Sequence, residues 1–492
     1  MTAPPAPTAA TAVPFFPPDL FDGDRDALLD AVRTIGTGAA QKFILGEHTA
    51  RLERALHDRL GAATADVVAC SSGTSGLSLL LAALDIGRGD EVVVPAFGCA
   101  PLAATVLDAG ARPVFADVDP VRLTMDPAAA EAAVGPRTKA LMPAHMFSVM
   151  ADMPAFRALA DRHGLHLIED SALAQGGTLA GRPAGCWGDA GVYSFVQVKT
   201  FGMPGEGAVV MTRDAELGRT VRMLRNHGQD GVHRFVHHRI GHNSRFDEVM
   251  ALFQLHRLPG LDGRLARRAE ISARYTRRLA PLAGRGLIAP PAGGDGRFHY
   301  VYTLLTERRD ELRAHLAERG IAAHVYYPCP LPAQPAFVPH APRGAAWPNA
   351  ESATRRNLSL PLYPHLTDAQ VDRIADAVHA FADPGTPTGA RTGTPTGART
   401  GARSGARSGA RADVDAPAGA PSGAPADAPS GGPSDVRTGA PADAPSDVRT
   451  GGPSGGPSGG PFGGPSGTPT DIRTPTDIHA STDTGPHTHT ER

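Results

Sequence analysis

The chain has 492 residues, enough for two or three domains. Its 48 Lys and Arg residues against 50 Asp and Glu residues give a formal net charge of −2, so neither nucleic acid nor an anionic membrane is expected as a partner. No apolar run approaches the roughly 18 residues that span a bilayer. The start of the chain, which lacks a basic region and is broken by prolines, is not typical of a secretory signal. The cysteines are scattered without a CxxC pair, which predicts reduced thiols in a cytoplasmic protein rather than a disulfide framework or a zinc site. They are Cys70, Cys99, Cys186 and Cys329.

Strand and helix patterns alternate through the first half of the chain. Apolar runs predict strands at residues 66–70, 91–95, 113–117, 139–143, 165–169, 191–196 and 208–211. Helical patterns such as "TSGLSLLLAALDIG" and "MPAFRALADRHG" lie between most of them, each closed by a glycine. This alternation predicts an α/β fold with a mostly parallel sheet covered by helices, over residues 13–255.

The pattern changes after residue 256. A long charged helix, "GRLARRAEISARYTRRLAPL", leads into a region with its own helix, "RDELRAHLAERG". We predict a smaller α+β domain over residues 256–383.

Composition changes again near residue 384, where the chain becomes Gly, Pro, Ala, Ser, Thr, Asp and Arg with almost no large apolar residues. Repeats such as "GARS" and "GGPSGGPSGG" are imperfect, and glycine does not recur at every third position, which excludes collagen. Such a segment cannot bury enough apolar surface to offset chain entropy. We predict that residues 384–492 are disordered, and likewise residues 1–12.

Three polar groups follow strands of the predicted sheet. Lys199 comes after the strand at 191–196, Asp170 ends the strand at 165–169, and the turn of residues 72–75 opens a helix after the first strand. Ligands of open α/β sheets collect at the carboxyl ends of the strands. A turn of small residues at a helix N-terminus presents free N–H groups and the positive end of the helix dipole, which suits a phosphate.

A phosphate cradle, a carboxylate and a lysine are what pyridoxal phosphate requires of a protein. The lysine forms a Schiff base with the aldehyde, and the carboxylate keeps the pyridine nitrogen protonated so that the ring accepts electrons. Each group alone has an ordinary alternative: Lys199 as a surface lysine with a buried stem, Asp170 as a helix N-cap, and "SSGTSG" as a common turn. Together, and without a GxGxxG after a strand, a P-loop, a GxSxG or an HExxH motif, they favour the cofactor site.

The histidines of "VHRFVHHRIGHNSR" are a second candidate cluster, at residues 233, 237, 238 and 242. Their spacing is irregular, and no carboxylate or cysteine is expected to join them. The interpretation favoured here is therefore solvent-exposed side chains rather than a metal site.

The sequence resembles the DegT/DnrJ/StrS group of fold-type-I sugar aminotransferases. The resemblance runs from "FILGEHTARLERAL" to "SLPLYPHLTDAQVDRIADAV", over nearly all of the predicted folded part. It includes "SSGTSGL", "RGDEVVVPAF", "ADMPAFRALADRHGLHLIEDSA", "GDAGVYSFVQVK", "GHNSRFDEVMA" and "YYPCPLP", in the order of the family.

The resemblance implies a role for each site residue. Lys199 would be the Schiff-base lysine and Asp170 the partner of the pyridine nitrogen. The family builds its sites across a homodimer interface, so Asn243 would reach the phosphate from the second subunit; the alternative is that Asn243 caps the helix that follows it. The remaining predicted cofactor-binding residues are Gly73, Thr74, Ser75 and Ser194, with Gln175 as a candidate near the ring.

Three positions depart from the family pattern. Leu173 stands where a glutamine or histidine usually approaches the 3-hydroxyl of the cofactor, and Gln175 lies two residues further on. Cys99 occupies a position near which many members have an aromatic residue over the ring, with Phe97 nearby. Tyr326 replaces the histidine of the "HYP" motif, which concerns substrate recognition.

The resemblance implies transamination from an amino acid, usually L-glutamate, to a keto-sugar linked to a nucleoside diphosphate. Alternatives are a keto-cyclitol acceptor, a cofactor-dependent sugar dehydratase, and a non-catalytic regulatory protein of the same fold. Dehydratases of the family typically lack the lysine, so Lys199 argues against that alternative.

A chain that ends near Asp383 is expected to keep its fold, cofactor and activity, because the residues beyond it lack core-forming side chains. Melting temperature and cofactor content of the truncated and full-length chains test this. A large fall in either would show that residues 384–492 dock on the rest of the protein.

Overall fold

The structure is a computed structural model that describes residues 12–17, 20–39, 41–289 and 294–382. The segments predicted to be disordered, residues 1–12 and 384–492, lie outside this part apart from Ala12. No helix of the described part is long and apolar enough to cross a membrane. All four cysteines are free thiols, as predicted.

A seven-stranded sheet organises the first half of the chain. The strand order is β1-β9-β8-β5-β4-β2-β3. Neighbours are parallel except at β9, which runs antiparallel to both β1 and β8. The mostly parallel sheet predicted from the sequence is therefore confirmed. Its strands are β1 (Asp66–Cys70), β2 (Glu91–Pro95), β3 (Arg112–Ala116), β4 (Thr138–Leu141), β5 (His166–Asp170), β8 (Ala190–Ser194) and β9 (Ala208–Thr212).

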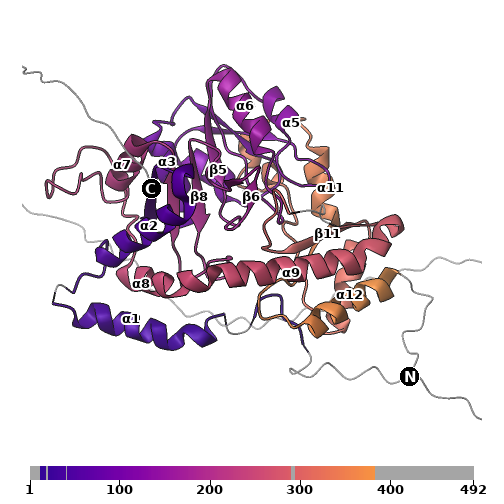
Figure 1. The fold of residues 1–492 in the computed structure, drawn as a ribbon. Coiled ribbons are helices and arrows are strands. Elements are labelled where there is room, and N and C mark those ends of the chain that lie inside the picture. Colours follow the sequence, from indigo (N-terminus) through magenta and orange to yellow (C-terminus); the bar gives the residue numbers. More distant parts are fainter. Residues whose placement is uncertain (1–11, 18–19, 40, 290–293, 383–492) are drawn as a thin grey trace, which may run out of the picture. The chain divides into compact units, whose positions relative to one another are not determined.

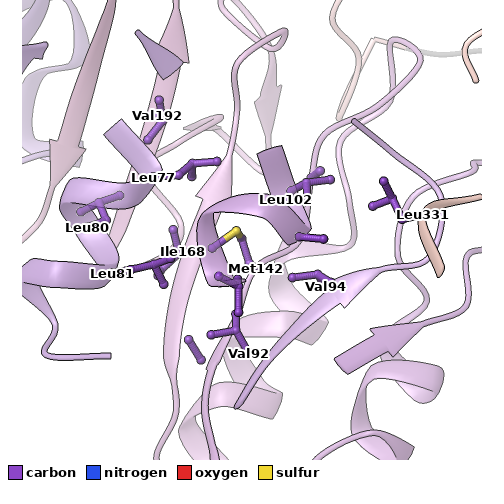
Figure 2. Close-up of a cluster of buried hydrophobic side chains, with 14 of the residues drawn as sticks. Leu77, Leu80, Leu81, Val92, Val94, Leu102, Met142, Ile168, Val192 and Leu331 are labelled. Atoms are coloured by element: carbon purple, nitrogen blue, oxygen red, sulfur yellow. The ribbon is translucent and has the colours of Figure 1, made fainter. Parts of the chain in front are cut away.

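Helices cover both faces of this sheet because side chains alternate along each strand. Val92 and Val94 face the side that α3, α4 and α7 cover, where Figure 2 shows them beside leucines of α3 and α4. Val93 faces the opposite side, packed with residues of α5 and α6. At the β1–β9 end, α2 and α8 cover that second side. These helices are α2 (Glu47–Leu60), α3 (Gly73–Ala83), α4 (Pro101–Asp108), α5 (Pro127–Ala132), α6 (Met153–His163), α7 (Ala215–Leu224) and α8 (Glu248–Arg257).

A second hydrophobic core lies in the last third of the described chain. An antiparallel sheet of order β10-β11-β12 packs with α9, α10 and α12. Figure 1 shows α9 continuing almost end to end from α8, with α12 beside α9. The division into two domains at residue 256 stays a prediction; it falls in the last turn of α8. The elements are β10 (Leu287–Ile288), β11 (Tyr302–Thr306), β12 (Asn357–Leu360), α9 (Leu261–Leu279), α10 (Arg309–Glu318) and α12 (Asp368–Ala382). The remaining α-helices and strands of the described residues are α1 (Arg25–Thr37), α11 (Pro348–Arg356) and the small hairpin β6 (Thr178–Leu179) and β7 (Arg182–Pro183).

The predicted glycine stops hold for one helix and fail for another. Gly164 closes α6 in the left-handed conformation, at φ 62°. α3 ends earlier than predicted, at Ala83, and Asp85 rather than Gly87 takes the positive φ, at 53°. A short polar side chain tolerates this conformation better than most residues do, which explains the difference.

Candidate active site

The register of the sheet brings the three predicted groups to one edge. Ala208 at the start of β9 pairs with both Cys70, the last residue of β1, and Ser194, the last residue of β8. Strands β1 and β8 therefore end at the same level, on either side of β9. In the neighbouring strand β5, Asp170 pairs with Val192 of β8. The loops that follow these three strands leave the sheet at the same edge, as expected for a ligand site of an open α/β sheet.

Lys199 lies in a tight turn after β8 and not at the end of a strand. The strand stops at Ser194, so the predicted strand over 191–196 is too long. The Lys199 N–H donates to the Val196 carbonyl (2.8 Å), and the Gly202 N–H donates to the Lys199 carbonyl (3.1 Å). A Cβ at Gly202 would stand 2.3 Å from the Gln197 carbonyl oxygen, so this turn requires glycine. Of the apolar residues between the strand and Lys199, Phe195 is buried while Val196 and Val198 are only partly buried, so their apolar character alone made the predicted strand too long.

The side chain of Lys199 is partly buried, and its surroundings change its basicity. Its Nζ lies 5.2 Å from the centre of the Tyr300 ring. Burial lowers the pKa of Lys199 below its ordinary value, and the nearby Cys99 and Asp170 oppose this effect. A lowered pKa increases the neutral fraction of the amine, the form that acts as a nucleophile or base.

Asp170 is buried, with 6% of its surface exposed. Burial raises its pKa, while the Ala172 N–H, Lys199 and His145 act in the opposite direction. The Ala172 N–H donates to Oδ1 (3.1 Å), and the Cys99 thiol lies 3.8 Å from Oδ2. No α-helix follows β5 before the β6 hairpin, so the alternative of Asp170 as a helix N-cap is wrong.

A buried pair beneath Asp170 was not predicted from the sequence. His145 Nε2 lies 3.0 Å from Glu169 Oε2, and neither side chain is exposed. Glu169 also accepts N–H groups of the loop before β8, from Gly185 (2.9 Å) and Gly188 (2.7 Å). The His145 N–H donates to the Asp170 carbonyl (3.0 Å). These bonds hold the end of β5, and therefore the Asp170 backbone, in place.

The N-terminus of α3 forms a cradle of hydroxyls and N–H groups. Ser72 caps the helix: its Oγ accepts the Ser75 N–H (3.1 Å) and its carbonyl accepts the Gly76 N–H (2.9 Å). The first N–H groups of a helix have no partner within it, which leaves those of Gly73 and Thr74 for a ligand. A Cβ at Gly73 would stand 3.3 Å from Ser194 Cβ, so the helix start approaches the end of β8 closely.

Further hydroxyls extend this cradle. Ser71 Oγ lies 2.9 Å from Ser75 Oγ and 3.0 Å from Ser244 Oγ. Ser71 and Ser244 were not predicted; Ser244 stands next to Asn243 in the quoted "GHNSR", and only its burial distinguishes it. Predicted Thr74 is at the same helix start and exposed, and predicted Ser194 is buried beside it.

The side chain of Asn243 is not part of the hydrogen bonds given above for the cradle. It is exposed, and its Oδ1 accepts from Arg245 Nε (2.9 Å). It does not cap the following helix, because α8 begins at Glu248 with Asp247 in the cap position. That alternative is wrong, while the role toward a second subunit stays a prediction.

The positions that depart from the family pattern also have defined environments. Cys99 is beside Asp170, and burial raises the pKa of its thiol to about 12, so it is a neutral donor there. Phe97 is fully buried and stacks on Phe147 instead (5.4 Å between ring centres). Gln175 accepts from Thr200 Oγ1 (3.1 Å), next to Lys199 in the chain, and lines a cavity of about 320 Å³.

Tyr326 and Leu173 are the other two positions that depart from the family pattern. Tyr326 lies near Tyr300, whose ring faces the Nζ of Lys199. Leu173 is partly buried and packs against the apolar core on both sides of the sheet, where it offers no polar contact.

This donor set fits pyridoxal phosphate. An amine of lowered pKa and a buried carboxylate lie within each other's electrostatic reach, and a helix N-terminus with free N–H groups and serine hydroxyls lies at the same edge. The fold and the site together define a fold-type-I pyridoxal-phosphate-dependent transferase.

Comparison with known proteins identifies the family. A model of the DegT/DnrJ/EryC1/StrS aminotransferase family matches residues 26–379. The chain belongs to this family, and the predictions of family, fold class and enzyme class are confirmed.

Relatives and solved structures support the same assignment. A dTDP-3-amino-3,4,6-trideoxy-alpha-D-glucose transaminase of Streptomyces venezuelae is 42% identical over 320 residues, 65% of this chain and 84% of that protein. A UDP-N-acetyl-3-dehydro-alpha-D-glucosamine 3-aminotransferase of Acidithiobacillus ferrooxidans is 40% identical over 72% of this chain and 93% of that protein. S. venezuelae DesV in complex with a ketimine intermediate has a TM-score of 0.71 at 38% identity, covering 76% of this chain and 99% of its own.

The predicted cofactor is confirmed by solved neighbours. NtdA of Bacillus subtilis carries bound PMP at 27% identity and a TM-score of 0.71, over 76% of this chain and 86% of its own. Spr1654 of Streptococcus pneumoniae has been solved in its PLP form at 25% identity and a TM-score of 0.69, over 76% of this chain and 99% of its own.

Proposed function

We propose that the protein transfers an amino group from L-glutamate to a keto-deoxysugar linked to a nucleoside diphosphate, in amino-sugar biosynthesis. The observation that carries the catalytic part is the placement of Lys199 and Asp170 at the edge of the sheet that also holds the α3 cradle. The sugar acceptor is supported by the relatives, which act on dTDP- and UDP-linked sugars.

The site residues divide the chemistry among them. When bound, pyridoxal phosphate supplies a ring that accepts electrons and a carbon that carries the amino group between the two substrates. Asp170 would hold the charge of the pyridine nitrogen. The N–H groups of Gly73 and Thr74 and the hydroxyls of Ser75 and Ser194 would hold the phosphate.

Lys199 would hold the cofactor and then serve as the base. The free Nζ of Lys199 would remove a proton from the donor carbon and deliver it to the cofactor carbon that receives the amino group. The lowered pKa of Lys199 favours this role because the free amine is neutral in more of the population. The Tyr300 ring beside Nζ restricts access of water on that side.

One relative supports the alternative of a regulatory protein without catalytic activity. A "pleiotropic regulatory protein" of Geobacillus stearothermophilus is 40% identical over 70% of this chain and 92% of its own. The amine, the carboxylate and the cradle are all present in this chain, however, and a protein that only binds partners does not need a lysine of lowered pKa at that place.

Incubation with L-glutamate and candidate keto-sugars tests the proposal. We expect stoichiometric 2-oxoglutarate and an aminated sugar, detected by mass spectrometry, when a dTDP- or UDP-linked 3-keto- or 4-keto-hexose is supplied. The same assay with a keto-cyclitol tests the alternative acceptor. Glutamate consumption with none of the nucleotide sugars, but with the cyclitol, would overturn the assignment of the sugar.

We further expect that Asn243 of one subunit contributes to the active site of the other. Asn243→Ala should bind the cofactor more weakly, because one phosphate ligand from the second subunit is lost. Mixing this variant with Lys199→Ala should restore about a quarter of wild-type activity, because half of the dimers are mixed and each has one complete site. No recovery after subunit exchange has been verified would mean that each site is built from one chain.

A further inference from the structure

The histidine-rich segment folds into a hairpin, residues 226–243, that follows α7. Asn226 pairs with Asn243 and Gln229 pairs with His237, both antiparallel. The His238 N–H donates to the Gly228 carbonyl (2.8 Å). This register places residue 238 opposite residue 228, and Asp230 lies two residues further along that arm.

The hairpin brings a carboxylate to two of the histidines. Asp230 Oδ2 lies 2.8 Å from His233 Nδ1 and 3.1 Å from His238 Nε2. All three potential ligand atoms lie within 4.8 Å of one another. The sequence-based argument that no carboxylate joins these histidines was therefore wrong, because Asp230 reaches His238 only through the pairing of the hairpin's arms.

The backbone holds the carboxylate in its orientation. Its other oxygen, Oδ1, accepts the N–H groups of Val232 (2.9 Å) and His233 (2.8 Å). These bonds turn the chain back on itself, so the His233 ring returns to the oxygen that His238 also faces. Oδ2 thus faces both imidazoles, while Oδ1 is held by the two N–H groups. Metal ligands are commonly oriented in this way by hydrogen bonds to their other atoms.

We propose that Asp230, His233 and His238 form a binding site for a divalent transition metal of the zinc class. Two imidazole nitrogens and one carboxylate oxygen are a common three-ligand set for Zn²⁺, and a fourth position is left for water or another ligand. Ligands at about 2.0–2.1 Å from a tetrahedral ion stand roughly 3.3 Å apart. The distances from Asp230 Oδ2 to His233 Nδ1 and His238 Nε2, 2.8 and 3.1 Å, are close to this value. Mg²⁺ and Ca²⁺ prefer oxygen ligands and fit this site poorly.

Such a site would stiffen a segment that leads directly to the cradle. The three ligands bridge both arms of the hairpin, and the hairpin ends at Asn243, next to the Ser244 hydroxyl that contacts Ser71. Among the apolar side chains of the hairpin, Val232, Phe235 and Ile240 are exposed by 72% or more and Val236 by 46%, so few packing contacts fix it otherwise. The site does not depend on the proposed reaction, since none of its ligands is among the residues that would hold the cofactor.

Calorimetric titration of the full-length, cofactor-loaded protein with Zn²⁺, after removal of metal by chelator and desalting, tests the proposal. We expect one equivalent of Zn²⁺ to bind at a site whose affinity falls at least tenfold in His233→Ala, His238→Ala and Asp230→Asn. The matched control is His237→Ala, because His237 lies on the same hairpin but bonds the His227 carbonyl through Nδ1 (2.7 Å) and is outside the cluster. That variant should bind as the wild type does.

Co²⁺ gives a second readout, because its visible bands depend on the number and type of its ligands. A site with two imidazoles and a carboxylate should give the visible bands of four- or five-coordinate Co²⁺, lost in His238→Ala and kept in His237→Ala. Far-UV circular dichroism and the visible absorbance of the cofactor establish that each variant is folded. Equal Zn²⁺ affinity in the wild type and the three cluster variants would overturn the proposed metal site. Asp230, His233 and His238 would then form a hydrogen-bonded cluster only.

Discussion

Replacing Lys199 by alanine is expected to lower transaminase activity by at least about 10⁴-fold while the fold persists. The change removes both the group that would hold the cofactor and the general base, and a base alone contributes about 10²- to 10⁴-fold. The Lys199 side chain is only partly buried, and its closest ring contact is the face of Tyr300 at 5.2 Å, so little packing is lost. Steady-state rates with glutamate, together with circular dichroism, measure the two effects.

Lys199→Arg separates the chemistry of the amine from its charge. Arginine keeps a positive charge opposite Asp170 but stays protonated, so it cannot serve as a base or attack an aldehyde. Both variants should therefore be inactive, whereas only the alanine variant removes the charge beside Asp170. Substantial activity in the arginine variant would show that Lys199 contributes through its charge alone.

The chain contains so few lysines that the lysine bonded to the cofactor can be identified directly. The 492 residues include only three lysines, Lys42, Lys139 and Lys199, and the first two are exposed. Borohydride reduction followed by peptide mapping should place the pyridoxyl group on Lys199. Lys42→Ala and Lys139→Ala are the matched controls and should keep full activity. A pyridoxyl group on either of these lysines in the wild type would contradict the assignment.

The sheet and the positions of the three main groups could be predicted because they depend on local patterns. Apolar runs between helical periods set the strands, and parallel strands place their carboxyl ends together whatever their order. Lys199, Asp170 and the turn before α3 therefore share one edge even though the sequence alone does not give the strand order. The placement of β9 between β1 and β8 was not predictable from these patterns.

The parts of the site that sequence reasoning missed depend on contacts between distant segments. Ser244 meets Ser71 across 173 positions of the chain, and Glu169 collects N–H groups from a loop 16 to 19 residues away. A serine or a glutamate is common in any sequence, so nothing local distinguishes these from surface residues. Asp230 is similar, since its partner His238 becomes a neighbour only when the hairpin closes.

Replacing Asp170 by asparagine is expected to slow the proton-transfer step by about 10²- to 10⁴-fold and to leave a folded protein that still binds the cofactor. Without the carboxylate the pyridine nitrogen loses the charge that keeps it protonated, and the ring accepts electrons poorly. Single-turnover loss of the cofactor's visible absorbance on mixing with glutamate measures this step separately from substrate release. Asp126→Asn is the control for an acid-to-amide change, because Asp126 is the N-cap of α5 and asparagine caps a helix as well as aspartate does.

The geometry at the end of β5 explains why Asp170→Asn should slow the reaction without unfolding the protein. The amide oxygen of asparagine can accept the Ala172 N–H as Oδ1 does now, and the backbone of residue 170 is held by the Pro143 carbonyl and the His145 N–H, both at 3.0 Å. Removal of a buried charge whose pKa is already raised by burial also costs little stability. A stable variant with slow proton transfer is therefore the expected outcome. Single-turnover rates near those of the wild type would show that the ring reacts without a charged partner, and the assignment of Asp170 would have to be abandoned.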